Sequence, residues 1–260
     1  MRFKEGDYLN YSLVDLTDEK GKSIRDEGKF FAYSQQAINE RCPHNIFFVH
    51  GYNNDFFAAL ETTYQYFDIL SAFRNFRANY VGAFWPGDTG AHFSRAVRQA
   101  DKASANFANL ISYIIKNSKV SKPYITIIAH SLGNRISAKA ILELRSRHRI
   151  APVRNFLQLA PAINANAYQK EFKDIPGLVK NIVVYHSARD RILNFYYAMW
   201  NIRRLKSGPK NKGLGVYGPY GPVPQNVHSL KAKDIARVNV KHGTYLENKR
   251  LIQSVAKNIK

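Results

Sequence analysis

The chain has 260 residues, of which 45% are hydrophobic and 22% are charged. This length allows a full hydrophobic core in one domain, and the composition excludes a disordered or fibrous chain. The 39 Lys and Arg residues outnumber the 19 Asp and Glu residues, so the formal net charge is +20, a field that attracts polyanions.

The positive charge is spread along the chain and is not confined to one motif. The sequence has no aromatic-interleaved basic motif and no zinc-finger spacing, so an interaction with nucleic acid rests on charge alone. Two interpretations stay open. The charge serves a polyanionic partner, either nucleic acid or an anionic membrane surface, or it serves general solubility with no dedicated partner. Nothing in the pattern indicates an oligomeric state.

Targeting and cofactor signals are absent from the sequence. The only cysteine, Cys42, cannot form an intramolecular disulfide, which is compatible with a reducing compartment. The first residues lack an apolar core of signal-peptide length, and no run approaches the roughly 20 apolar residues of a membrane-spanning helix. We therefore expect a soluble cytoplasmic protein, unless it is exported without a cleavable signal. No metalloprotease motif, paired-cysteine spacing or phosphate-binding loop occurs, so we expect no metal and no other cofactor.

Short apolar segments alternate along the chain with segments of helical length. Candidate edge strands lie at 8–16 and 30–33, within the first 40 residues. Strands rich in Val, Ile, Phe and Tyr, and buried on both faces, are predicted at 46–50, 80–85, 124–130, 154–160, 181–186 and 236–240. Helices are predicted at 57–73, at 97–117, directly after Ser131, and at 245–259. The Gly- and Pro-dense segment 207–226 is predicted to form a long ordered loop, either a lid or a plain surface excursion.

This order of elements predicts an α/β fold, in which a mostly parallel central sheet carries helices on both faces. The sequence contains no internal repeat. We interpret residues 1–260 as a single domain, with residues 1–40 as an edge-strand extension.

Residues 129–133, Ala-His-Ser-Leu-Gly, lie where a buried strand meets an amphipathic helix. They match the nucleophile elbow G-x-S-x-G, with Ala129 in place of the first glycine. Small residues are required there because the tight turn packs the strand end against the helix start. In an open α/β sheet the carboxyl ends of the strands form the usual ligand edge. The pattern therefore predicts that Ser131 is a nucleophile, and not only a turn residue or helix cap.

A serine hydroxyl needs a base, and the base needs an acid that fixes its tautomer. In a fold with this elbow they follow in the chain order serine, acid, histidine. Asp190 comes just after the strand 181–186, and His242 lies between the predicted strand 236–240 and the last helix. Asp190 is alternatively a helix cap, and Asp174 is a weaker rival because it lies in a polar connection. His228, beside the long loop, is the alternative base.

The tetrahedral intermediate of acyl transfer needs two backbone N–H donors. Leu132, directly after the nucleophile, is predicted to supply one donor. Tyr52, in the loop after the strand 46–50, is predicted to supply the other. The candidate pocket residues around Ser131 are Gly51, His50, Trp85 and His130. His50 has a second interpretation, in which it only holds the loop. Trp85 also has a second interpretation, as part of a structural turn. An apolar acyl site is a candidate role for Phe195, Tyr196, Tyr197 and Trp200, with helix packing as the alternative.

The segments HGYNN, HSLGN, LAPAI and SARD and the late histidine together resemble the α/β-hydrolase superfamily. They are most similar to a branch of bacterial serine hydrolases, largely of unknown function, with an HGYN loop and an HSxGN elbow. The resemblance covers about residues 44–258. It implies an α/β-hydrolase fold with Ser131 as nucleophile, Asp190 as acid, His242 as base, and Tyr52 and Leu132 as oxyanion donors. The departures are Ala129 and the basic, Gly/Pro-rich region before the last strand, which leaves the substrate open.

The leading functional hypothesis is a serine hydrolase that cleaves a carboxylic ester, small or lipid-like, through an acyl-enzyme on Ser131. Thioesters and amides use the same machinery, so the fold and the triad do not choose among them. The alternative hypothesis is a non-catalytic protein of this fold that binds nucleic acid or an anionic membrane surface through its charge.

Overall fold

The fold was analysed in a computed structural model, which describes residues 31–34, 38–74, 76–87, 93–147, 153–196 and 212–260. Its centre is a seven-stranded sheet in the order β1-β3-β2-β4-β5-β6-β7. β1 pairs antiparallel with β3, and all other neighbouring strands pair in parallel. The strands are β1 (Phe31–Ser34), β2 (His44–Val49), β3 (Ala78–Phe84), β4 (Tyr124–His130), β5 (Val153–Leu159), β6 (Asn181–His186) and β7 (Val227–Lys231).

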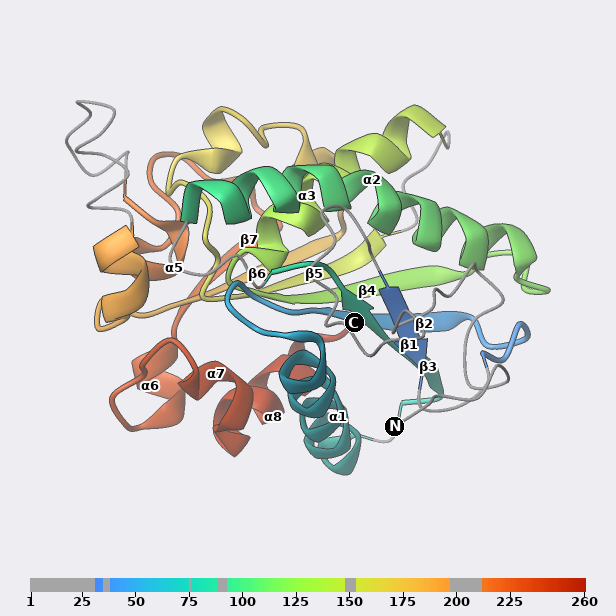
Figure 1. Cartoon of the computed structure of the whole chain (residues 1–260), viewed down its shortest axis with the longest axis horizontal. Helices are drawn as coiled ribbons and strands as arrows, with labels where there is room; N and C mark the ends of the chain where they lie inside the picture. Colours follow the sequence, from blue (N-terminus) through green and yellow to red (C-terminus); the bar gives the residue numbers. More distant parts are fainter. Residues whose placement is uncertain (1–30, 35–37, 75, 88–92, 148–152, 197–211) are drawn as a thin grey trace, which may run out of the picture.

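Helices cover both faces of the sheet (Figure 1). The α-helices are α1 (Phe56–Phe73), α2 (Phe93–Asn117), α3 (Gly133–Arg147), α5 (Leu214–Tyr217), α6 (Ala232–Ala236), α7 (Thr244–Glu247) and α8 (Lys249–Asn258). Short 3-10 turns occur at Ala167–Gln169 and Ile175–Gly177, and residues 191–196 are also helical. α2 and α3 lie on one face, and α1 and α8 lie on the other (Figure 1). The prediction of an α/β fold with a mostly parallel sheet is confirmed.

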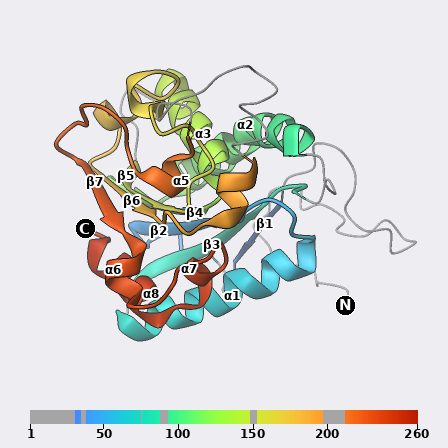
Figure 2. The ribbon, with the colours of Figure 1, turned by 90° about the vertical axis from the view of Figure 1, so that its left-hand side faces the viewer.

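The central strands are apolar on consecutive residues because both of their faces are covered. Every residue of β2 is buried, and in β4 only the first residue is partly exposed. The five predicted strands from 46–50 to 181–186 are confirmed as β2 to β6, within two residues at each end. The parallel strands all end at the same edge of the sheet, which faces the viewer in Figure 2. The loops that leave this edge carry every predicted catalytic residue.

The predicted strand at 236–240 is wrong. The last strand is β7, nine residues earlier in the chain, and residues 232–236 form α6 instead. Arg237 ends α6 in the left-handed region, with φ 56°, and a residue in that conformation cannot continue an extended strand. The alternating apolar residues after it are therefore part of a loop. His242 lies in this loop, and His228 lies on β7.

The remaining elements refine the sequence prediction. The predicted last helix is divided at Asn248, whose side chain accepts a hydrogen bond from Leu251 N (3.1 Å) and so begins α8. The predicted edge strand 30–33 corresponds to β1, whereas 8–16 lies outside the described residues. In the predicted loop 207–226, residues 207–211 are also outside them, and the four-residue helix α5 interrupts the remainder. Within the described residues, no helix is both long and apolar enough to cross a membrane.

Candidate active site

Ser131 lies in the turn between β4 and α3, in a conformation that a side chain rarely adopts. Its φ is +53°, and its backbone N–H donates to Leu159 O on the neighbouring strand (3.0 Å). Left-handed backbone at a non-glycine residue is strained and is found at functional sites. The side chain is almost fully buried, with 4% of its residue surface exposed. The strand-to-helix turn therefore has the geometry of a nucleophile elbow.

Gly133 is required by close packing beneath this turn. A Cβ atom at Gly133 would lie 2.3 Å from Val49 O and 2.6 Å from His50 O, which are backbone atoms at the end of β2. Such contacts are far shorter than van der Waals distance, so any side chain would push the start of α3 away from the sheet. The last glycine of the elbow motif thus lets the helix approach the neighbouring strand.

Asn134 holds the elbow in place through its side chain. No role was predicted for it from the sequence. Its side chain is fully buried, and its Nδ2 donates to the carbonyls of Ala129 (2.9 Å), Ser131 (3.1 Å) and Leu159 (3.3 Å). The side chain thus ties together three carbonyl groups around the turn. Asn134 is the last residue of the HSLGN segment, but its place in that motif did not indicate these contacts.

Asp190 and His242 form a hydrogen-bonded pair at the same edge of the sheet. His242 Nδ1 lies 2.7 Å from Asp190 Oδ2, although 52 residues separate them in the chain. The Asp190 carboxylate is fully buried, and its other oxygen accepts from Leu193 N (3.0 Å). Asp190 therefore caps the helical segment 191–196 and also binds the histidine, so both interpretations of this residue describe real contacts. The second bond fixes the carboxylate in place.

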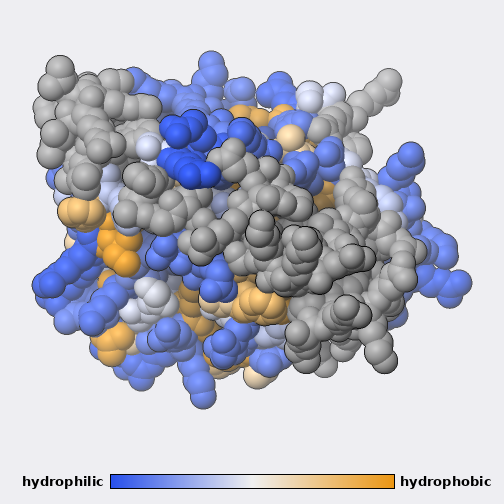
Figure 3. All heavy atoms as spheres, in the orientation of Figure 1, coloured by the Kyte–Doolittle hydropathy of each residue, from blue (hydrophilic) through white to orange (hydrophobic). Residues whose placement is uncertain are grey.

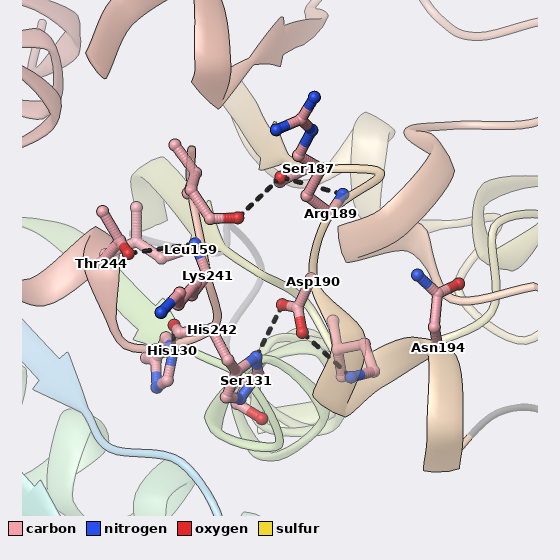
Figure 4. Close-up of polar contacts among 12 residues, drawn as sticks. His130, Ser131, Leu159, Ser187, Arg189, Asp190, Asn194, Lys241, His242 and Thr244 are labelled. Carbon is pink, nitrogen blue, oxygen red and sulfur yellow. Dashed lines mark hydrogen bonds and ion pairs between the residues drawn. The ribbon is translucent and has the colours of Figure 1, made fainter. Parts of the chain in front are cut away.

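Ser131, His242 and Asp190 lie next to one another in Figure 4. Hydrogen-bonding of Nδ1 to the carboxylate leaves Nε2 of His242 as the basic nitrogen of the ring. Within the described residues, no hydrogen bond joins the Ser131 hydroxyl to His242. Such contacts are commonly long without substrate and tighten in the complex. The three predicted triad residues are thus brought together by the fold.

His130, the residue before Ser131, contacts the base directly. Its Nε2 lies 3.0 Å from the backbone carbonyl of His242, and the two rings are 4.7 Å apart between centroids. A carbonyl only accepts, so Nε2 of His130 carries the hydrogen, and Nδ1 is an unprotonated nitrogen without a partner among the described residues. Burial, followed by the charge of His242, lowers the pKa of His130 to about 3. This ring is therefore a neutral support for the loop that carries the base.

The loop after β2 is held by His50 and Trp85. Trp85 N donates to His50 Nε2 (3.1 Å), so Nδ1 carries the hydrogen and donates it to Gly51 O (2.8 Å). Trp85 Nε1 donates to His50 O (2.9 Å), and the two rings stack at 5.6 Å. Burial lowers the pKa of His50 to about 4, so the ring is neutral at neutral pH. Both side chains are buried and hold the loop in place.

This loop comes within contact distance of the elbow. A Cβ atom at Gly51 would lie 2.9 Å from both Ser131 Cβ and His130 Nδ1, so glycine is needed for the close approach. Tyr52, the predicted oxyanion donor, is the next residue in the chain. Leu132, the other predicted donor, has a backbone N–H that donates to no group within the described part of the chain. The Gly51 loop and the backbone of Leu132 thus both adjoin Ser131.

The rival residues lie elsewhere. His228 is exposed on β7, the edge strand, where it pairs with Val183. Asp174 stands at the N-cap position of the 3-10 turn Ile175–Gly177 without a side-chain capping bond, and it lies 3.8 Å from Arg145, with half of its side chain exposed. Neither residue contacts Asp190 or His242 within the described residues.

Aromatic side chains gather beside the Gly51 loop. Tyr196 stacks on Phe93 at 4.7 Å, and both rings meet Tyr52 edge-on, at 5.8 Å and 6.0 Å. Phe195, the other described member of the predicted acyl site, is 59% exposed. Tyr197 and Trp200 lie outside the described residues. Among the described residues, no group of three or more His, Cys, Asp and Glu side chains is arranged to hold a metal ion.

The sheet is mostly parallel, a strained serine elbow follows the fourth described strand, and an Asp–His pair lies on later loops. These features together define an α/β hydrolase. The family model described as "Alpha/beta hydrolase of unknown function (DUF900)" matches residues 32–256. The chain belongs to this family. A comparison with curated proteins gives no match.

Solved structures give the same fold at low sequence identity. Lipase B of Aspergillus fumigatus superposes with a TM-score of 0.56 at 14% identity, over 86% of this chain and 54% of the lipase. This chain thus spans about half the length of that lipase. An esterase of Pyrobaculum calidifontis has a TM-score of 0.49 at 16% identity, over 92% of this chain and 84% of the esterase. The family match confirms the predicted superfamily, whereas the likenesses to solved structures extend to the fold alone.

Proposed function

We propose that this protein is a serine hydrolase that cleaves a carboxylic ester through an acyl-enzyme on Ser131. The observation that carries the proposal is the 2.7 Å bond between Asp190 and His242, formed by a fully buried carboxylate beside a serine in the left-handed region. Each of these features is costly or rare by itself, and catalysis by a triad needs all of them at one place.

The reaction begins when Ser131 Oγ attacks the ester carbonyl carbon and His242 Nε2 accepts the hydroxyl proton. Asp190 keeps the imidazole in the required tautomer and stabilises the imidazolium that forms. The oxyanion is stabilised by the N–H groups of Leu132 and Tyr52. His242 then donates its proton to the departing alkoxide, which leaves as an alcohol. Water then attacks the acyl carbon and gives a proton to His242. The bond between the acyl carbon and Ser131 Oγ breaks, Oγ takes the proton back from His242, and the acid product leaves.

Apolar surroundings favour an ester over a charged substrate at the reacting centre. The rings of Tyr52, Phe93 and Tyr196 pack together beside the Gly51 loop, where an acyl chain or an aromatic group would find apolar contacts. The structural neighbours include an esterase and a lipase by name, which is compatible with the same class of reaction.

A fluorophosphonate probe tests the nucleophile, because it reacts covalently with an activated serine. We expect the wild type to be labelled and Ser131→Ala to remain unlabelled. Equal labelling of both proteins would refute the assignment of Ser131. Labelling of neither would refute an intact site and favour the alternative, a non-catalytic protein of this fold that binds a polyanion.

A matched pair of histidine variants tests the base on a short-chain nitrophenyl ester. We expect His242→Ala to lose about 10⁴–10⁶-fold in kcat, as for the removal of a triad member. His228→Ala makes the same chemical change on exposed β7 and is expected to stay within about twofold of the wild type. The reverse result would assign the base to His228 and contradict the proposed triad.

A further inference from the structure

The two segments that carry Asp190 and His242 also form a continuous surface beside the site. We call residues 187–196 and 237–243 the rim. Ser187 Oγ donates to Val240 O (2.9 Å), and Arg189 Nη1 donates to Asn239 Oδ1, so the two segments are joined by more than the Asp–His pair. Figure 4 shows Ser187, Arg189 and Lys241 around Asp190 and His242. Any molecule that enters the site from this side passes the rim.

Every exposed charge on the rim is positive. The exposed charged side chains are Arg189, Arg191, Arg237 and Lys241. The only carboxylate in either segment is Asp190, which is fully buried and paired with His242. The rim therefore concentrates, beside the site, the positive charge that the whole chain carries as +20.

Large apolar side chains are exposed between these cations. Ile192 is 47% exposed, Phe195 is 59% exposed and Val238 is 51% exposed. Figure 3 shows apolar (orange) and hydrophilic (blue) spheres side by side at its left-hand margin, where Figure 1 draws the segment 191–196 and α6. These exposed aliphatic and aromatic groups lie in the same two segments as Asp190 and His242, which makes them candidates for a contact surface.

We propose that the rim docks the protein on an anionic lipid surface, and that the ester it cleaves is presented by that surface. This inference rests on the proposed function. Cations are attracted to anionic headgroups, while aliphatic and aromatic side chains enter the boundary between headgroups and acyl chains. Nucleic acid would account for the cations but not for exposed Ile192 and Val238. The combination of both kinds of side chain favours lipid.

Docking by the rim turns the Ser131 site toward the lipid. Asp190 and His242 are within the rim segments themselves, so the catalytic groups lie at the docked face and not on the far side of the molecule. An ester in the outer leaflet would then reach Ser131 without first dissolving in water. A water-soluble ester would gain nothing from the rim.

Vesicle cosedimentation tests the docking, with Ser131→Ala as the parent so that turnover plays no part. We expect binding to vesicles of equal parts phosphatidylglycerol and phosphatidylcholine, and at least tenfold weaker binding to phosphatidylcholine alone. Arg191→Gln with Lys241→Gln should weaken binding about 25-fold, since each cation near an anionic surface contributes about fivefold. Ile192→Ser with Phe195→Ser should weaken it at least tenfold, and this loss should persist in high salt.

Matched controls remove the same groups at the opposite edge of the sheet. Lys116→Gln with Lys122→Gln deletes two exposed cations near the start of β4, and Val223→Ser deletes an apolar side chain that is 42% exposed before β7. Both should bind like the parent, and thermal unfolding should show that all variants are folded. Equal losses of vesicle binding in the rim and control variants would refute a dedicated surface. No vesicle binding at all, or preferential binding to a nucleic-acid oligomer, would refute it too.

The failure of docking and the failure of the proposed function are distinguishable. Turnover of a soluble ester by the wild type, without vesicle binding, would overturn the docking inference and leave the hydrolase. Vesicle binding without any turnover would overturn the hydrolase and leave a lipid-binding protein. Faster hydrolysis of a fluorogenic ester embedded in phosphatidylglycerol vesicles than in phosphatidylcholine vesicles is the result expected when both hold.

Discussion

Replacing Asp190 with asparagine exchanges one carboxylate oxygen of the proposed triad for an NH₂ group and leaves the volume almost the same. In the wild type, one carboxylate oxygen binds His242 Nδ1 (2.7 Å) and the other binds Leu193 N (3.0 Å). An amide has one oxygen and one NH₂ group, so it cannot accept both bonds. If the oxygen keeps the bond to Leu193, the NH₂ group faces Nδ1 and makes that nitrogen an acceptor. The hydrogen of the imidazole then lies on Nε2, where it blocks proton transfer from Ser131.

The expected loss follows from this wrong tautomer. Because Asp190 is fully buried, no water can replace the lost carboxylate beside the imidazolium. A wrong tautomer in a triad of this type lowers kcat by about 10⁴-fold. At about 1.36 kcal/mol per tenfold change in rate, this is a loss of about 5.4 kcal/mol of transition-state stabilisation. The Michaelis constant should change little, because the substrate does not contact the carboxylate.

The assay is steady-state hydrolysis of a short-chain nitrophenyl ester, with fluorophosphonate labelling as a count of active sites. Asp174→Asn is the matched control, because it makes the same change at a half-exposed aspartate whose nearest cation, Arg145, is 3.8 Å away. We expect this control to keep at least half of the wild-type kcat. If the folded Asp190→Asn protein has a kcat within tenfold of the wild-type kcat, the assignment of Asp190 as the acid is refuted. The tautomer argument is then refuted as well.

Three further results are expected. Gly133→Ala should lower the free energy of unfolding by about 1–3 kcal/mol or more, since its Cβ would lie 2.3 Å from Val49 O. A urea midpoint equal to that of the wild type would contradict the close packing of Gly133 against β2. His130→Leu should lower kcat about tenfold with little change in KM, because the bond to the carbonyl of His242 is lost. His130→Gln keeps a donor and should recover most of the rate. Equal rates for the two variants would exclude this positioning role of His130. The pKa of His50 is lowered to about 4, so its contribution to stability is complete above about pH 6.5 and is lost as the pH falls toward 4. Urea unfolding should therefore give a free energy about 2 kcal/mol lower at about pH 5 than at about pH 7 from this one side chain, and a flat profile would contradict its burial as a neutral ring.

The sequence was sufficient for the central strands and the elbow because one strong physical constraint governs each. Strands that are covered on both faces need consecutive apolar residues, and β4 and β6 were predicted at their observed bounds. The elbow needs small residues at fixed offsets, which makes its pattern local and readable. The order serine, acid, histidine then reduced the search for Asp190 and His242 to the ends of later strands.

The last strand could not be read in the same way, because alternation is a weak signal in a short segment. Residues 236–240 alternate between apolar and polar, but the pattern arises from a loop whose apolar members Ala236 and Val240 are buried for other reasons. Val240 O accepts from Ser187 Oγ, a contact between residues 53 apart in the chain. β7 itself has only its first residue fully buried, so it lacks the apolar run that identifies the central strands. His242 was assigned for an incorrect local reason and nevertheless lies beside Asp190.

The contacts that support the site were beyond the reach of sequence analysis because they join distant residues. The bond between His130 and the carbonyl of His242 spans 112 residues, and nothing around either residue indicates the other. The fit of Gly51 against Ser131 and His130 likewise appears only when two neighbouring strands end together. Local patterns specify which residues perform the chemistry, whereas the sheet topology determines which residues hold them in place.

Ala129 shows which part of the elbow motif is physically necessary. It is the sixth residue of β4, is fully buried, and pairs in register with Val49 and Gln158 on the two neighbouring strands. Its φ is not positive, so this position does not need the conformational freedom of glycine. The strain lies two residues later at Ser131, and the close approach lies at Gly133. A small side chain is therefore enough at the first position, whereas the last position admits none, and the departure from the motif is no argument against a functional nucleophile.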